Sequence, residues 1–228
     1  MDFTQHTPTA QLTVAERTRA GYYGAIKAWA TAQADIAQYY SVSVDDTAFA
    51  LTFTPLADNL TNFPAKITAD ANAVKFDCIY SGTSAAASSF NHGNYAKDAV
   101  FYIYNDARNF MLTSDMSALV ANISGKTFDG NTDARALIMA FTSNAYICTG
   151  GSAYTSSHGA SSGNINRNCG GVSATYLLSR LAVPKTDMIA DRVYTLDGGT
   201  DLPPAGVFTI AGKQFYRLFN NCVFKMED

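Results

Sequence analysis

The sequence predicts an α+β fold in which a long N-terminal helix packs on a mainly antiparallel sheet, with two or three shorter helices and a C-terminal β-meander. Three observations support this prediction. Residues 13–40 keep one face of a helix in register for about seven turns. Residues 41–53, 74–80 and 99–104 have the composition and alternation of strands. Residues 207–226 contain short apolar runs separated by Gly and Asn turns, which is typical of hairpins.

The helix is predicted to begin at Thr13, because Thr13-Val-Ala-Glu16 has the form of a capping box. Its continuous face reads Ala15, Arg19, Tyr22, Ile26, Trp29, Gln33, Ile36 and Tyr40. We expect the helix core to consist of Tyr22, Ile26, Trp29, Ile36 and Tyr40. The same stripe could drive a coiled coil with Gln33 as its polar position. Packing on the chain's own sheet is favoured, because the stripe mixes residue types instead of repeating Leu.

Later segments complete the predicted domain, a single α+β domain spanning residues 1–228. Hydroxyl N-caps and apolar faces predict helices over 114–123, 132–144 and 173–182. Residues 56–73 and 81–94 have mixed or small polar composition and are expected to be loops, whereas 193–196 is expected to be a strand. An extended arm at 1–12 and a long polar loop at 149–168 lie outside the regular elements.

Composition excludes several classes of protein. Hydrophobic residues make up 47% of the 228 residues, too many for a disordered chain. The net charge of −3 lacks the basic footprint of a nucleic-acid binder. No apolar run reaches the length of a membrane span, and the first residues lack the pattern of an export signal. We therefore expect neither nucleic acid nor membrane as a partner.

The loop at 149–168 is the segment most suited to recognition. Its polar residues could contact a glycan or a protein partner, and the candidates are Tyr154, His158, Asn164 and Arg167. The alternative is a flexible surface loop that lies against a neighbouring subunit. Cys148 and Cys169 flank this loop. A disulfide between them would remove about 3 kcal/mol of loop entropy, but free buried thiols are favoured because no export signal is present.

No catalytic, cofactor-binding or metal-binding residues are predicted. Residues 129–133 place oxygen ligands as an EF-hand loop begins, but the later positions of that loop do not match, and 197–201 is read as a turn. A Cys–His hydrolase would use Cys148 or Cys169 with His158. No recognised catalytic motif supports it, and we expect the chain not to be an enzyme.

Low charge favours association between copies. Charged residues make up only 15% of the chain, against about 25% in an average soluble domain. With its abundant Ala, Ser, Thr, Asn and Gly, its N-terminus without an export signal and its terminal hairpins at 207–226, the chain resembles structural proteins of tailed-bacteriophage virions. That resemblance implies a head, neck or tail component, made in the host cytoplasm, that binds copies of itself and other virion proteins. A receptor- or glycan-binding module using the 149–168 loop is the alternative.

Overall fold

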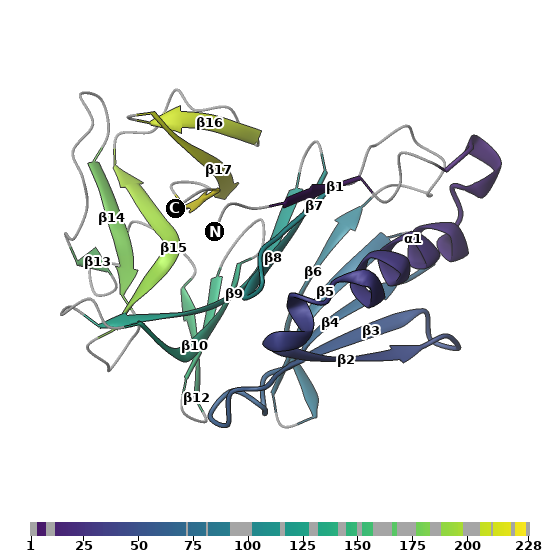
Figure 1. Ribbon diagram of the computed structural model, residues 1–228, viewed down its shortest axis with the longest axis horizontal. Coiled ribbons are helices and arrows are strands. Elements are labelled where there is room, and N and C mark those ends of the chain that lie inside the picture. Colours follow the sequence, from purple (N-terminus) through teal and green to yellow (C-terminus); the bar gives the residue numbers. More distant parts are fainter. Residues whose placement is uncertain are drawn as a thin grey trace.

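The structure is a computed structural model. It describes residues 4–7, 12–71, 73–80, 82–91, 102–114, 117–127, 132–140, 145–149, 152–156, 166–167, 177–182, 188–197, 206–210, 212–219 and 222–226. Over these residues the chain forms two antiparallel sheets and one α-helix (Figure 1). The predicted α+β class is therefore wrong, because β-sheet dominates and the shorter helices are strands.

The smaller sheet has five strands in sequential order, β2 to β6. Each pair of successive strands is antiparallel. One face is apolar, since Leu51, Ile67 and Phe76 come side by side in the register of the three central strands and are all buried. The strands are β2 (Tyr40–Asp45), β3 (Ala50–Pro55), β4 (Ala65–Ala69), β5 (Ala73–Tyr80) and β6 (Thr83–Asn91).

The larger sheet has thirteen strands, and its main path runs β1-β7-β8-β9-β15-β18-β17-β16. β10 pairs with β9 and continues into β11 and β12, and β14 pairs with β15 and β13. The hairpins predicted over 207–226 are present as the last three strands of the chain. The thirteen strands are β1 (Thr4–His6), β7 (Tyr102–Asn105), β8 (Asn109–Ser114), β9 (Ser117–Thr127), β10 (Thr132–Ala140), β11 (Ala145–Thr149), β12 (Ser152–Ser156), β13 (Asn166–Arg167), β14 (Leu177–Ala182), β15 (Met188–Asp197), β16 (Gly206–Ile210), β17 (Lys213–Phe219) and β18 (Cys222–Lys225).

Three segments predicted as helices belong to this sheet. Strands β9, β10 and β14 occupy most of 114–123, 132–144 and 173–182. β9 pairs with β8, β10 and β15, and its consecutive residues Val120 and Ala121 are both buried. A strand covered on both faces reads as a continuous apolar run, which periodicity alone does not distinguish from a buried helix.

The N-terminal helix is shorter than predicted. Val14–Glu16 forms a 3₁₀ turn (η1), α1 spans Arg19–Ala32, and a second 3₁₀ turn (η2, Ile36–Gln38) leads into β2. The Glu16 carboxylate accepts hydrogen bonds from the Thr13 amide (2.9 Å) and hydroxyl (2.7 Å), so the predicted capping box belongs to η1. The cap of α1 is Thr18, whose hydroxyl accepts a hydrogen bond from the amide of Gly21 (3.2 Å).

All five residues predicted for the helix core are buried, although only three of them lie in α1. Ile36 belongs to η2 and Tyr40 opens β2. The rings of Trp29 and Tyr40 pack against Phe110 of β8, at 5.9 and 5.6 Å between centroids, and Phe110 also lies 4.7 Å from the Phe53 ring. One hydrophobic core therefore spans α1, the five-stranded sheet and the β7–β9 part of the larger sheet.

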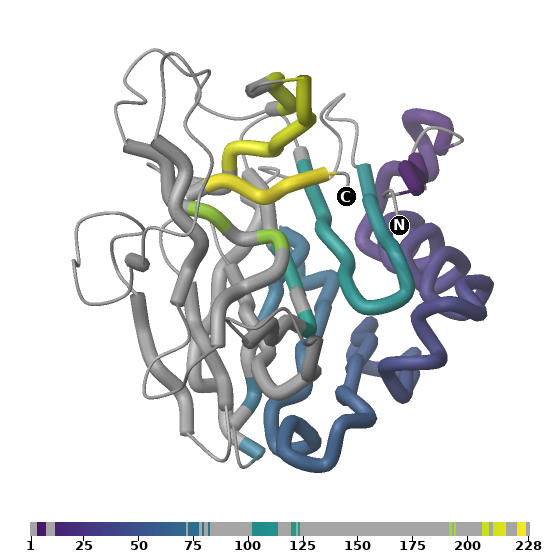
Figure 2. The backbone as a smooth tube through the Cα atoms, turned by 60° about the vertical axis from the view of Figure 1, so that its left-hand side comes forward, coloured from purple at the N-terminus to yellow at the C-terminus, as the bar shows by residue number. Residues whose placement is uncertain are grey.

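The turn between β7 and β8 connects these parts. Asp106 accepts hydrogen bonds from the amides of Arg108 and Asn109, both at 2.8 Å, and forms an ion pair with Arg192 of β15 at 3.2 Å. From the other side, the Tyr40 hydroxyl donates to the Arg108 carbonyl (2.9 Å). In Figure 2 this hairpin (teal) lies between the helix and the C-terminal strands (yellow).

One side of α1 holds the β2–β3 turn and the end of β4. Arg19 donates to the carbonyl of Ala69 (2.6 Å), and Tyr23 and Lys27 both donate to the Asp46 carboxylate (2.8 and 2.7 Å). These three residues are spaced four apart, so they share a face of the helix. Burial, then the hydrogen bond to Asp46, raises the pKa of Tyr23 to about 12.

The first prediction concerns two helix glycines. A Cβ at Gly21 would overlap the carbonyl oxygen of Glu16, whereas a Cβ at Gly24 would meet nothing within 4 Å. We expect Gly21→Ala to reduce the free energy of unfolding by about 1–3 kcal/mol and Gly24→Ala to raise it by about 0.8–1 kcal/mol. Urea denaturation of both variants measures the difference. Equal effects would contradict the close approach of Glu16 to the helix.

The second prediction concerns alkaline pH. Because the Tyr23 pKa is higher in the folded chain than in the unfolded chain, its stabilising effect is complete below pH about 10 and is lost as pH rises to about 12. We expect Tyr23→Phe to lose less stability than the parent over this interval. Urea denaturation at several pH values within it measures this. Identical pH profiles for the two proteins would show that folding does not raise the Tyr23 pKa.

Candidate functional site

The predicted recognition residues fall in two strands and in segments outside the described residues. Tyr154 lies in β12, opposite Ile147 of β11 in the strand register, and Arg167 lies in β13 opposite Arg180. The expected loop at 149–168 is thus partly sheet, because a β-branched and aromatic stretch before it provides a strand with which β12 can pair. His158 and Asn164 lie outside the described residues.

Of the two cysteines predicted to form a disulfide or to act as a nucleophile, only one lies in the described residues. Cys148 lies in β11, opposite Leu137 of β10 and Ala153 of β12, while Cys169 lies outside the described residues. Neither the Cys148–Cys169 disulfide nor a Cys–His pair with His158 is therefore tested by the geometry.

The described residues contain no group of three or more His, Cys, Asp or Glu side chains placed to hold a metal ion. Of the two turns considered as cation sites, residues 129–131 and 198–201 lie outside the described ranges. Within those same ranges, no helix is long and apolar enough to cross a membrane.

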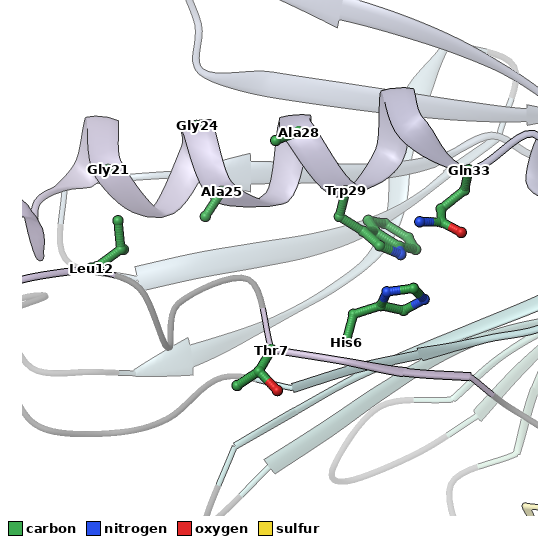
Figure 3. A pocket seen from close by; sticks show the side chains of 9 residues that line it. All are labelled: His6, Thr7, Leu12, Gly21, Gly24, Ala25, Ala28, Trp29 and Gln33. Carbon is green, nitrogen blue, oxygen red and sulfur yellow. The ribbon is translucent and has the colours of Figure 1, made fainter.

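A cleft of about 550 Å³ lies between the N-terminal arm and α1 (Figure 3). The arm forms one wall because β1 pairs antiparallel with β7, placing His6 opposite Ile103. Small side chains on α1 form the other wall and leave room beside the helix. The lining residues are His6, Thr7, Leu12, Gly21, Gly24, Ala25, Ala28, Trp29 and Gln33.

His6 is the polar feature of this cleft. Its Nε2 atom is buried and has no hydrogen-bond partner, and its ring lies near Trp29 and Gln33 (Figure 3). The indole N–H of Trp29 already donates to Asn105 Oδ1 (3.1 Å). His6 and Gln33 therefore provide the polar groups at this end of the cleft, and the rest of its wall is mostly apolar.

Sequence reasoning did not identify this cleft. The signal that could have found it is the spacing of Gly21, Gly24, Ala25 and Ala28, which places four small residues along one side of the helix. Such a stripe allows another segment to come close to the helix backbone. The position of the arm beside it depends on the pairing of β1 with β7, which the sequence pattern does not specify.

The outer edge of β2 is a second candidate site. Among the described strands, β2 pairs with β3 alone, in an unbroken register from Tyr40–Pro55 to Asp45–Ala50. Ser41, Ser43 and Val44 are exposed. Leu56 is 50% exposed and donates its amide to the Tyr39 carbonyl (2.9 Å), so it continues β3 on the inner side of β2.

The chain matches no protein-family model, no curated protein and no solved structure. Its function is therefore inferred from its own residues and geometry.

Proposed function

We propose that this protein is a non-enzymatic structural component that works by binding copies of itself and neighbouring proteins in an assembled particle. The observation that carries this proposal is the unprotected edge of β2. Edge strands in monomeric proteins are usually blocked by Lys, Pro, an inward-pointing charge or a bulge, because their free amide and carbonyl groups attract other strands. β2 has no Lys, no Pro and no bulge, and its only charge is Asp45 at the end.

Apolar exposure at the same edge supports association. Val44 of this edge strand is 40% exposed, and it is one of the four large hydrophobic side chains that are exposed in the described part of the chain. With charged residues at 15% of the sequence, few like-charge repulsions keep copies apart. A surface of this kind is stabilised when a second strand covers it.

A virion is the particle we propose, in the head, neck or tail of a tailed bacteriophage. This part of the proposal rests on composition and on the resemblance in style to such proteins. The described residues provide surfaces for contact with other proteins, and the proposed role requires no cofactor.

The third prediction tests association. We expect the parent protein to sediment at micromolar concentration with a mass above the 24.4 kDa of one chain. Val44→Lys should reduce that mass, because it places a charge on the exposed side of the edge strand. Val14→Lys is the matched control, since Val14 is more exposed (69%) but lies in the 3₁₀ turn η1 and not in a strand. A parent that sediments as a single chain would contradict the proposal.

A binding module for a small uncharged ligand is the second candidate function, and the buried, unpartnered Nε2 of His6 favours it. A buried polar atom without a partner is costly, and a hydroxyl group in the cleft would satisfy it. The mostly apolar lining suits the carbon skeleton of such a ligand.

The fourth prediction uses cyclohexanol, which combines one hydroxyl with an apolar ring. Trp29 is the chain's only Trp and lines the cleft, so its fluorescence reports directly on occupancy. We expect a saturable change in emission for the parent and a weaker one for His6→Phe, which removes the ring nitrogens. A linear response, or equal responses of the two proteins, would exclude binding at this cleft.

A further inference from the structure

We propose that two copies of this chain join through β2, antiparallel and around a two-fold axis at Val42, to make one continuous ten-stranded sheet. This inference rests on the proposed function and specifies the contact through which association begins. Each copy contributes the five-stranded sheet β2 to β6, of which β2 is an edge strand (Figure 1). The occupant of the edge is the same strand of a second copy.

The hydrogen-bonding pattern of β2 identifies which groups are available. The amide of Leu56 donates to the carbonyl of Tyr39, so residues 39 and 56 are joined by a hydrogen bond across the β2–β3 ladder. Because bonded and non-bonded pairs alternate along an antiparallel ladder, the backbone groups of 41, 43 and 45 also point toward β3. Those of Tyr40, Val42 and Val44 point outward. Pro55 fits this assignment, because it lies opposite Tyr40 at a non-bonded position.

Only one antiparallel register uses all three outward-pointing residues. Centred on Val42, it pairs Val42 with Val42 of the second copy and Tyr40 with Val44 of the second copy. By symmetry, Val44 also pairs with Tyr40 of the second copy, which makes three pairs in all. Each pair contributes two hydrogen bonds, so about six join the copies. Moving the centre to Ser43 leaves Tyr40 without a partner, and moving it to Ser41 leaves Val44 without one.

Charge also favours this arrangement. A parallel, in-register pair would place the two Asp45 carboxylates side by side, which is destabilising. In the antiparallel pair, Asp45 lies opposite Tyr39 of the second copy. The ring of Tyr39 is covered by the Arg108 guanidinium, 5.0 Å from its centroid. An acidic group therefore approaches a basic one at each end of the contact.

In this register the apolar side chains of both copies lie on one face of the joined sheet and the serines lie on the other. The axis is perpendicular to the sheet, so each face continues from one copy to the other. Val42 and Val44 extend the apolar face of β3, on which Phe53 lies opposite Val42 and Leu51 lies opposite Val44. Ser41 and Ser43 extend the polar face and lie opposite each other in closer, non-bonded pairs with a Cα separation of about 4.5 Å.

The fifth prediction uses that Ser41–Ser43 proximity. A Cα separation of about 4.5 Å is within the range of a disulfide. In the double variant Ser41→Cys/Ser43→Cys, Cys at position 41 of each copy faces Cys at position 43 of the other, so oxidation should give mostly covalent dimers on non-reducing gels. Ser41→Cys and Ser43→Cys alone should give no more dimer than the parent, whose four cysteines set the background.

The control is the double variant Thr52→Cys/Thr54→Cys. These residues lie on β3 directly opposite Ser43 and Ser41, on the same face but one strand inside the sheet. They should not cross-link between copies. The substituted side chains at 41 and 43 are exposed, so the variants should fold as the parent does, and circular dichroism checks this.

The outcomes separate this inference from the proposed function. Strong cross-linking of Ser43→Cys alone would indicate a Ser43-centred register and overturn the one proposed. No cross-linking beyond the parent, with a parent that still sediments as an oligomer, would overturn the β2 contact and leave the structural role intact. A parent that sediments as a single chain overturns both.

Discussion

The buried ion pair between Asp106 and Arg192 is the constraint on which the rest of the structure depends, because it fixes the β7–β8 turn against β15 within the larger sheet. Both side chains are only 7% exposed, and their charged atoms lie 3.2 Å apart. Removing two charges from water is costly, and breaking such a pair by deleting one partner typically costs about 3–5 kcal/mol because the other charge is left buried alone. The pair is therefore formed only when β15 and the β7–β8 turn are correctly placed. Arg192 also donates to the Lys225 carbonyl (3.4 Å), which brings in β18.

The same turn fixes the helix and the smaller sheet. Asn105 accepts the indole N–H of Trp29, and the Arg108 carbonyl accepts the hydroxyl of Tyr40. Burial, with the negative charge of Asp106 as a second cause, raises the pKa of Tyr40 well above its usual range, so this phenol remains a hydrogen-bond donor. Three residues at this turn, Asn105, Asp106 and Arg108, thus satisfy polar groups from α1, β15 and β2. Around them the aromatic rings of both sheets form one core.

The sequence was most informative where its pattern was local. The face containing Tyr22, Ile26 and Trp29 was identifiable from spacing alone, and the hairpins at 207–226 from their turn residues. The length of the helix could not be identified in this way. Thr18 caps a new helix after η1, and Gly21 allows the close approach of the Glu16 carbonyl there, which no periodicity reveals. β9 was misread for a different reason: its consecutive residues Val120 and Ala121 are both buried, and a strand buried on both faces lacks alternation. The cleft at His6 arises from the pairing of β1 with the distant strand β7, and the open edge of β2 depends on where all the other strands pair, so sequence reasoning reached neither.

The position of β9 at the centre of the larger sheet has a kinetic consequence. β9 pairs with its sequence neighbours β8 and β10, but also with β15, which begins about sixty residues later at Met188. Bringing such distant segments together costs loop-closure entropy before any contact repays it, so folds with this contact order form slowly, in milliseconds to seconds. During synthesis, the end of β9 at Lys126 and Thr127 has no partner on its β15 side until β15 has left the ribosome. For that interval the nascent chain carries a temporary sheet edge that the finished protein hides, and chaperones that shield unpaired strands would act at this stage.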